Sequence, residues 1–266
     1  MSIRIEKSGP DGSETVWTII HSRPEARNAM DPASAAELHA AFLAFDADES
    51  ARVAVFWGEG GAFCAGFDLK YAMTMSGPEA MDALDDHSDN SAGPMGPSRL
   101  ELTKPVIAAI AGPAVAGGME LAAWADMRVM EETAFMGVFC RRWGVPLIDG
   151  GTHRLPRLVG EGRAMDLILT GRRVDAAECL AIGLCEYVVP EGQARAKAEQ
   201  LAHDISRFPQ GCMRADMRAA KAQHGRSARA ALADEWSGSK AALSEGIQGA
   251  ARFSSGKGRG GDFSEI

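Results

Sequence analysis

The sequence predicts an α/β fold in which buried strands alternate with helices. Short apolar runs rich in β-branched and aromatic residues end at glycine or proline, which is typical of buried strands. Helical stretches with good capping residues follow these runs. Such alternation favours a largely parallel sheet built from ββα or βαβ units.

The N-terminal part is expected to form a hairpin followed by a helix. Strands are expected at residues 3–8 and 14–20, separated by the turn-forming residues 9–12, Gly-Pro-Asp-Gly. The helix is expected to begin after Asp31, because Asp31 is a good N-cap and Pro32 suits the first helical position. Its apolar face is expected to consist of Leu38, Ala41, Phe42 and Phe45.

Buried strands and a glycine-entered helix are expected in the central part. The strands are predicted at 52–57, 105–110 and 127–130. A helix over 119–125, entered through two glycines, is expected between the second and third of them. Residues 76–98 are rich in glycine, proline and aspartate and have no apolar period, so we expect a mobile segment that covers a pocket.

The C-terminal part is expected to be helical from residue 160 onward. The clearest helices are predicted at 163–170, 175–182, 191–206 and 228–253. We therefore expect two regions, a catalytic core over 1–195 and a C-terminal helical region over 196–266.

Composition argues against several classes of partner. The net charge of −8 argues against nucleic acid or an anionic membrane as the main partner. No apolar run reaches the roughly 18 residues of a membrane span. The N-terminus reads as the polar start of a strand, and the five cysteines have no metal-ligand spacing. We expect a cytoplasmic protein with free thiols and no metal site.

Two glycine-bearing segments, residues 60–69 and 111–120, each follow a buried strand. Their small residues allow a ligand to approach the backbone closely, and the second segment leads directly into a helix whose first N–H groups are unpaired. One N–H from each segment, directed at the same point, would form an oxyanion hole. Two ordinary strand-to-helix turns are the alternative interpretation.

Six sequence blocks, in order, resemble the crotonase (enoyl-CoA hydratase/isomerase) superfamily over nearly the full chain. The blocks are RPEARNAM (23–30), FCAGFDL (63–69), KPVIAAIAG (104–112), AGGMELA (116–122), GGTHRLPR (150–157) and TGRR (170–173) with AIGL (181–184). The resemblance implies a crotonase-type spiral of ββα units with a C-terminal helical region used in trimerisation. It also implies a homotrimer or dimer of trimers that acts on acyl-CoA. Neither a metal nor an organic cofactor is expected, since coenzyme A enters as part of the substrate.

Matching the motifs residue by residue assigns binding roles. The resemblance places the oxyanion N–H groups on Phe67 and Gly117. It implies a coenzyme A path along Glu25, Arg27, Ala65, Gly66, Asp68 and Leu69.

The acid/base groups are where the chain departs from the family pattern. Hydratases of the family carry two glutamates, and the first matches Glu120, which could also be a first-turn carboxylate favoured by the helix dipole. The second falls on Cys140, whose thiol is a poor substitute for a carboxylate. Isomerase, hydrolase and dehalogenase branches place a working Asp or Glu at the position of Ile148. Asp149 lies one residue beyond, so catalysis and N-capping of the next helix are both open for it.

The best single label is an enoyl-CoA hydratase-like enzyme that stabilises an enolate in an oxyanion hole. The alternatives of the same superfamily are an enoyl-CoA isomerase or an acyl-CoA thioester hydrolase working through Glu120 and Asp149. An alternative of another class is an RNA-binding family member, against which the negative charge speaks.

Overall fold

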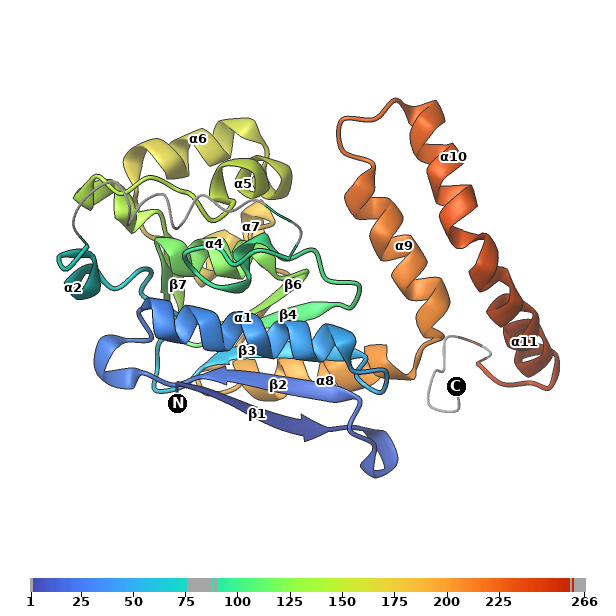
Figure 1. Cartoon of the computed structure of the whole chain (residues 1–266). Coiled ribbons are helices and arrows are strands. Elements are labelled where there is room, and N and C mark those ends of the chain that lie inside the picture. The colour runs from blue at the N-terminus through green and yellow to red at the C-terminus, as the bar shows by residue number, and fades with distance from the viewer. Residues whose placement is uncertain (1, 76–87, 89, 259, 261–266) are drawn as a thin grey trace. The chain divides into compact units, whose positions relative to one another are not determined.

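The computed structural model describes residues 2–75, 88, 90–258 and 260, which divide into two compact units (Figure 1). The first unit covers Met1–Ala202 and the second His203–Ile266. Their boundary lies inside helix α8, Ala194–Arg207, as does the boundary expected after residue 195. Residues 76–87 and 89 of the expected pocket-covering segment lie outside the described residues.

The main sheet of the first unit has six strands in the order β1-β2-β3-β4-β6-β9. They are β1 Ile3–Ser8, β2 Val16–His21, β3 Val53–Gly58, β4 Val106–Ile110, β6 Met127–Glu131 and β9 Tyr187–Val189. The first pair is an antiparallel hairpin, and each later pair is parallel. The predicted hairpin and the predicted parallel pairing are therefore confirmed.

A second, three-stranded sheet was not predicted. It consists of β5 Pro113–Val115, β7 Phe135–Gly137 and β8 Val174–Asp175, with β5 parallel to β7 and β7 antiparallel to β8. Strands of two or three residues are too short for an alternating pattern to be visible in the sequence. Their effect is local, because β5 carries the chain directly from β4 into helix α4.

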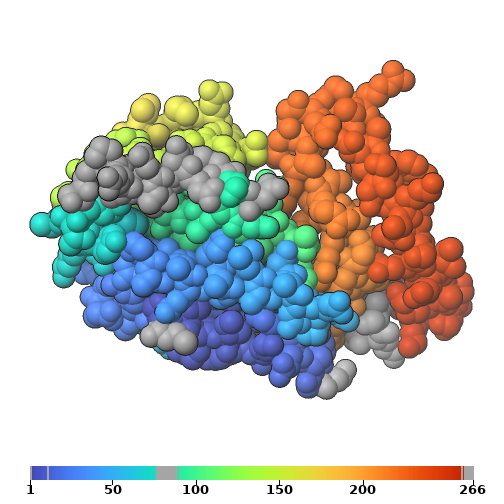
Figure 2. Space-filling model, viewed as in Figure 1, coloured from blue at the N-terminus to red at the C-terminus, as the bar shows by residue number. Residues whose placement is uncertain are grey.

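Helix α1, Pro32–Ala47, begins as predicted. The Asp31 side chain accepts a hydrogen bond of 2.8 Å from the Ser34 N–H, and Pro32 occupies the first helical position. The predicted apolar face is buried: Leu38, Ala41, Phe42 and Phe45. On the face shown in Figure 2, α1 lies between the N-terminal hairpin and the segment that contains the 3₁₀ helix η3, Pro97–Arg99.

The remaining helices of the first unit surround the glycine segments. They are α2 Leu69–Ala72, α4 Gly117–Trp124, α5 Gly151–Val159, α6 Glu161–Thr170 and α7 Ala176–Ile182, with 3₁₀ helices η1 Pro10–Gly12, η2 Pro24–Ala26 and η4 Phe139–Trp143. Helix α4 starts at Gly117, two residues earlier than predicted, so both entry glycines belong to its first turn.

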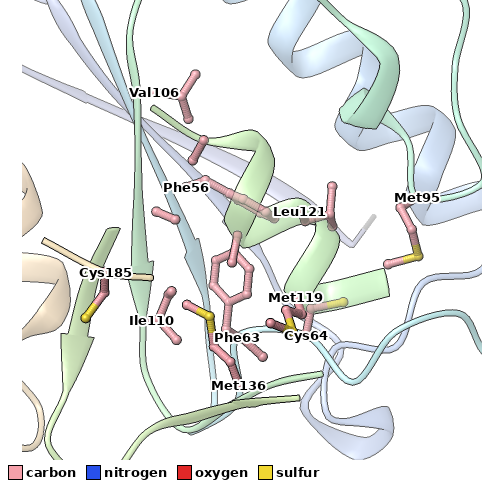
Figure 3. Close-up of a cluster of buried hydrophobic side chains, with 14 of the residues drawn as sticks. Phe56, Phe63, Cys64, Met95, Val106, Ile110, Met119, Leu121, Met136 and Cys185 are labelled. Atoms are coloured by element: carbon pink, nitrogen blue, oxygen red, sulfur yellow. The ribbon is translucent and has the colours of Figure 1, made fainter. Parts of the chain in front are cut away.

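Aromatic rings connect the core to the first glycine segment. Phe42 of α1 contacts Phe56 of β3 edge-on at 5.7 Å between ring centroids, and Phe56 contacts Phe63 at 4.9 Å (Figure 3). Such pairs stabilise beyond the area they bury, by about 0.5–1.5 kcal/mol each. These ring contacts therefore hold the loop after β3 against the core.

The second unit contains α9 Gln210–Ala222, α10 Ala228–Ser239 and α11 Leu243–Ser254. The single long helix predicted over 228–253 is wrong, because the 3₁₀ helix η5, Lys240–Ala242, interrupts it. Gly238 is a poor helix former, and the Ser237 hydroxyl donates to the Asp234 carbonyl three residues earlier, which loosens the helix before the break. Among the described residues, no helix is long and apolar enough to span a membrane.

Candidate active site

Phe67 lies in the loop after β3, paired with Met30 in a short parallel bridge. The Met30 N–H donates to the Gly66 carbonyl, and the Asp68 N–H donates to the Met30 carbonyl, both at 2.8 Å. These two bonds flank Phe67, so its own N–H is turned away from Met30. It finds no acceptor in the described part of the chain.

Gly117 opens helix α4 after a left-handed residue, Ala116, with φ of 54°. The Ala116 carbonyl accepts from the N–H groups of Met119 and Glu120, at 3.0 and 3.3 Å. The Gly117 N–H precedes the first helical hydrogen bond, and no acceptor for it lies within the described ranges. It stands at the positive end of the helix dipole.

The two glycine segments lie directly against each other. The Val115 N–H donates to the Cys64 carbonyl at 3.0 Å. Gly66 has φ of 94°, and a Cβ placed on it would lie 2.8 Å from Ala116 Cβ and 3.2 Å from the Gly117 nitrogen. Only glycine permits this approach. The fold thus places Gly66, which precedes Phe67, beside Gly117 of the other segment.

Glu120 is a buried carboxylate on the same first turn as Gly117, only 3% exposed. Its Oε1 accepts from the backbone N–H groups of Asp149, at 3.0 Å, and Gly151, at 2.8 Å. Its Oε2 accepts no hydrogen bond from the described residues. Burial, aided by the charge of Asp149, raises the pKa of Glu120 to about 7. A carboxylate that only complements the helix dipole would be solvated and acidic, whereas this one is buried and has a pKa near neutrality.

Cys140 lies in η4 and is buried close enough to Glu120 to be affected by its charge. Burial, followed by the Glu120 carboxylate, raises the pKa of the Cys140 thiol. The thiol therefore stays protonated at neutral pH and has no role as a thiolate base. The residue that the resemblance matches to the second glutamate is therefore a neutral group.

Asp149 does not cap helix α5, so that alternative is wrong. The N-cap is Gly150, with φ of 96°, which has no side chain to bond to the first turn. The Gly151 N–H that a cap would satisfy is bonded to Glu120 instead. The Asp149 carboxylate is buried, which raises its pKa, and its Oδ1 accepts from the Met95 N–H at 3.0 Å and from the Ser98 hydroxyl.

The six residues of the predicted coenzyme A path lie on two adjacent segments. The Ala65 N–H donates to the Arg27 carbonyl at 3.1 Å, which joins the segment after β2 to the first glycine segment. Glu25, Arg27 and Leu69 are exposed, whereas Ala65, Gly66 and Asp68 are at least half-buried. The Asp68 carboxylate is engaged locally: it caps α2 and pairs with Arg23 at 3.2 Å.

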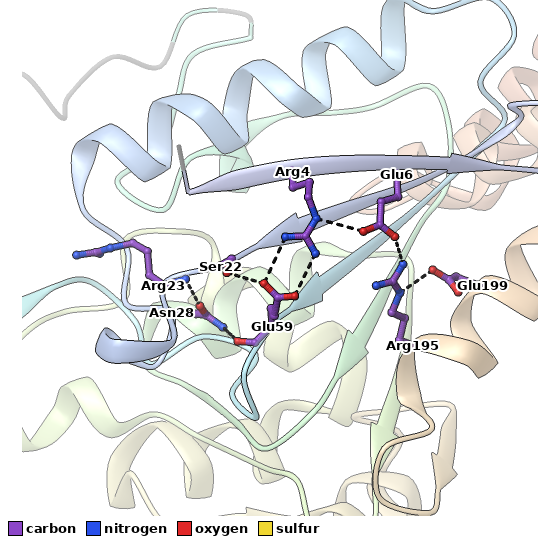
Figure 4. A network of polar contacts seen from close by, with 8 residues as sticks. All are labelled: Arg4, Glu6, Ser22, Arg23, Asn28, Glu59, Arg195 and Glu199. Atoms are coloured by element: carbon purple, nitrogen blue, oxygen red, sulfur yellow. Dashed lines mark hydrogen bonds and ion pairs between the residues drawn. The ribbon is translucent and has the colours of Figure 1, made fainter.

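Asn28 and Arg154 were not singled out from the sequence. The fully buried Asn28 accepts from the Arg23 N–H at 2.7 Å and donates to the carbonyls of Glu59, at 2.8 Å, and Ala62, at 2.7 Å (Figure 4). It holds the two segments of the predicted coenzyme A path together. Asn28 has a positive φ of 55°, a conformation that asparagine tolerates better than most residues. The presence of an asparagine in this turn is the available sequence signal. Arg154 donates to the carbonyls of Asp149 and Ser98 and so joins the two loops that contain them. Nothing in the local sequence indicates this.

No group of three or more metal-ligating side chains is found in the described part of the chain. Shallow surface space of about 290 Å³ is lined by Ser2, Ser22, Arg23, Asp31, Ala33, Ser34 and Glu37. That space lies beside the N-terminal hairpin and α1. Its lining includes none of Glu120, Phe67 and Gly117.

The chain is similar to proteins of one known family. Residues 11–250 match the model of the enoyl-CoA hydratase/isomerase family. The chain is 40% identical over 213 residues to enoyl-CoA hydratase EchA19 of Mycobacterium tuberculosis, covering 75% of this chain and 76% of that protein. It is 37% identical to carnitinyl-CoA dehydratase of Proteus mirabilis, covering 72% and 71%. A crystal structure of enoyl-CoA hydratase from Bacillus anthracis superimposes with a TM-score of 0.86 at 29% identity, covering 96% of each chain. The chain therefore belongs to the enoyl-CoA hydratase/isomerase family.

Proposed function

We propose that this enoyl-CoA hydratase-like enzyme adds water to an enoyl-CoA thioester with Glu120 as its only acid/base carboxylate. The observation that carries the proposal is the first turn of α4. It presents an N–H without an acceptor among the described residues, at Gly117, and a buried carboxylate with a pKa near neutrality, at Glu120. Both groups are needed to form an enolate and to manage its protons.

The thioester oxygen is proposed to accept hydrogen bonds from the Phe67 and Gly117 N–H groups. Negative charge develops on this oxygen when a nucleophile adds to the β-carbon, so donors fixed there stabilise the enolate more than the substrate. The dipole of α4 adds to this stabilisation.

Glu120 is proposed to act twice in one turnover. In its ionised form it takes a proton from water as the water oxygen bonds to the β-carbon. The same proton is then delivered to the α-carbon, which collapses the enolate and restores the ionised carboxylate. Water supplies both the hydroxyl and the proton, so one carboxylate suffices and the protonated Cys140 thiol is not required. A pKa near the working pH suits a group that must both accept and donate.

Coenzyme A is proposed to lie along Glu25, Arg27, Ala65, Gly66, Asp68 and Leu69, and no separate cofactor is proposed. The hydrogen bond between Ala65 and Arg27 and the close approach at Gly66 support this, because both bring backbone of the two segments to the oxyanion residues. The names of two relatives, a hydratase and a dehydratase of CoA thioesters, support water addition or removal as the reaction class.

Isomerisation and thioester hydrolysis are the alternatives, and they would use Asp149 as a second base. The observation that favours these alternatives is that Asp149 is a buried carboxylate whose charge acts on Glu120. Against this, the Asp149 Oδ1 is already engaged by Met95 and Ser98.

Incubation with a panel of enoyl-, hydroxyacyl- and branched acyl-CoA thioesters, followed by mass analysis, separates the reactions. Hydration adds the mass of one water, hydrolysis releases free coenzyme A, and isomerisation leaves the mass unchanged. We expect added water with at least one short enoyl-CoA. Free coenzyme A or a shifted double bond without added water would overturn hydration.

A homotrimer or dimer of trimers is proposed as the working assembly. The second unit exposes large apolar side chains on α10 and α11: Leu232, Trp236, Leu243 and Ile247. Several large exposed apolar side chains on one helical unit are typical of a surface between subunits.

A further inference from the structure

The segment Gly93–Ser98 is folded back on itself beside the site. Gly93 and Gly96 exchange reciprocal backbone hydrogen bonds of 2.8 Å. Gly96 has φ of 81° and lies so close to α1 that a Cβ on it would be 2.7 Å from the Ala35 carbonyl oxygen. This tight turn directs Met95 into the interior, where its side chain is fully buried.

Met95 lies against Gly117. A Cβ placed on Gly117 would be 2.6 Å from Met95 Sδ and 2.8 Å from Met95 Cγ, so the thioether is in contact with the Gly117 backbone. An acyl group whose carbonyl oxygen is bound by the Gly117 N–H starts at this contact. The Met95 side chain is therefore among the first groups that a longer acyl chain would contact.

The Asp149 carboxylate fixes this segment from the opposite side. Its Oδ1 accepts from the Met95 N–H at 3.0 Å and from the Ser98 hydroxyl. Gly93 leaves room for the carboxylate, since a Cβ there would be 2.7 Å from Asp149 Oδ1. Arg154 closes the link by donating to the carbonyls of Asp149, at 2.8 Å, and Ser98, at 2.7 Å.

We propose that Met95 restricts the substrate to short acyl chains, and that Asp149 is a positioning residue that holds Met95 against Gly117. The inference rests on the proposed enoyl-CoA activity. Methionine has a flexible side chain that fills irregular space, so the position of its backbone decides which space it fills. The Met95 N–H and the Ser98 hydroxyl both donate to the buried Asp149 Oδ1, and these two hydrogen bonds fix that backbone. They require an acceptor oxygen at Asp149, with or without a charge.

The first test is Met95→Ala, with Met165→Ala as control because Met165 is exposed on α6. The readout is the ratio of kcat/KM for decenoyl-CoA to that for crotonyl-CoA. We expect Met95→Ala to raise this ratio at least about 10-fold, since each methylene accommodated in an apolar pocket is worth roughly that factor. The control should leave the ratio unchanged. An unchanged ratio in Met95→Ala with native circular dichroism overturns the proposal, and Met95→Val repeats the test if the alanine variant does not fold.

The second test compares Asp149→Asn with Asp149→Ala. Asparagine keeps the acceptor oxygen, so its chain-length ratio and turnover should stay close to wild type. Alanine removes the acceptor, so its ratio should shift in the direction of Met95→Ala. A loss of turnover of about 100-fold in the asparagine variant would make Asp149 a base and overturn its positioning role. An unchanged ratio in the alanine variant would overturn it as well.

A failure of the proposed function is separable from a failure of this inference. If the wild-type enzyme adds water to no enoyl-CoA, hydration is wrong whatever Met95 does. The size preference is then measured by calorimetry, as the Kd of decanoyl-CoA relative to butanoyl-CoA. Met95→Ala should again improve the longer ligand at least about 10-fold, and equal ratios in both proteins reject the role of Met95.

Discussion

At the scale of single residues, Glu120 is one of a few buried acidic side chains in the described part of the chain, and burial raises its pKa to about 7. Its place on a glycine-entered helix could be predicted from the sequence, because the motif around it is local. Its pKa could not, because the raised value depends on burial and on Asp149, 29 residues away. The role of Asp149 could not be decided from the sequence for the same reason, because its partners Met95 and Ser98 lie 54 and 51 residues earlier.

Glu120→Gln should lower kcat at least about 100-fold on the true substrate. Glutamine keeps an Oε1 that accepts from Asp149 and Gly151 but has no ionisable group, so only proton transfer is removed. Steady-state kinetics with the best thioester of the panel measures the effect. Turnover equal to wild type would mean that another group carries the proton.

His21 should make the fold sensitive to acid. It is fully buried, its ring nitrogens have no partner among the described residues, and burial lowers its pKa from 6.5 to about 4. The unfolded chain therefore binds a proton before the folded one does, and stability falls as pH falls from 6.5 to 4. The contribution is on the order of 3 kcal/mol.

Urea unfolding of wild type and His21→Leu at several pH values checks this. The free energy of unfolding of wild type should fall relative to that of the variant across this range. Parallel pH dependences in the two proteins would contradict it.

At the scale of elements, helix α4 carries the site because both of its ends are fixed. Its first turn lies against the first glycine segment through Gly66 and Gly118. At its other end the buried Arg128 donates to the carbonyls of Ala125, at 2.8 Å, and Ala122, at 3.5 Å, and pairs with Glu186. Gly117 and Glu120 therefore keep a fixed separation on one rigid turn.

Gly66→Ala tests this arrangement of elements. The new methyl group would press on Ala116 and on the Gly117 nitrogen and would separate the two N–H groups proposed to form the oxyanion hole, so kcat should fall at least about 100-fold. Gly61→Ala is the matched control. Gly61 also has a positive φ, of 81°, but a Cβ there meets nothing within 4 Å. The control should lose some stability but keep its activity, and equal activity losses in both variants would contradict the account.

The elements that could be predicted are those with a complete local signal. The helix after Asp31 has a cap, a proline and an apolar face, and the strand over 106–110 is a continuous apolar run. The strand over 113–115 could not be predicted, because three residues form it only through pairing with 135–137. The break at 240–242 was missed because apolar periodicity continued through weak helix formers.

At the scale of the whole molecule, the residues proposed for catalysis all belong to the first compact unit. The second unit is a helical module in which Glu245 of α11 accepts from the N–H groups of Gly211 and Cys212 at the start of α9. The sequence predicted its helical character from composition and periodicity. The near-helical spacing of its apolar residues Leu232, Trp236 and Leu243 is visible in the sequence, and the structure adds that their side chains are exposed.

Static light scattering should give a mass of about three times 28.1 kDa, or twice that value for a dimer of trimers. Burial of Trp236 and its neighbours between subunits is the physical reason, and Trp236→Glu should lower the mass by placing a charge in that surface. A mass of a single chain at micromolar concentration for wild type would contradict the proposed assembly.

The pH dependence of kcat/KM for hydration of crotonyl-CoA tests most directly the claim that Glu120 alone manages the protons. Glu120 must be ionised to accept a proton from water, and its pKa is about 7. The account predicts that kcat/KM is constant above this pH and falls about tenfold per pH unit below it, with one ionisation on the acidic limb. A profile that stays flat below pH 7, or an acidic limb that persists unchanged in the residual activity of Glu120→Gln, would contradict it.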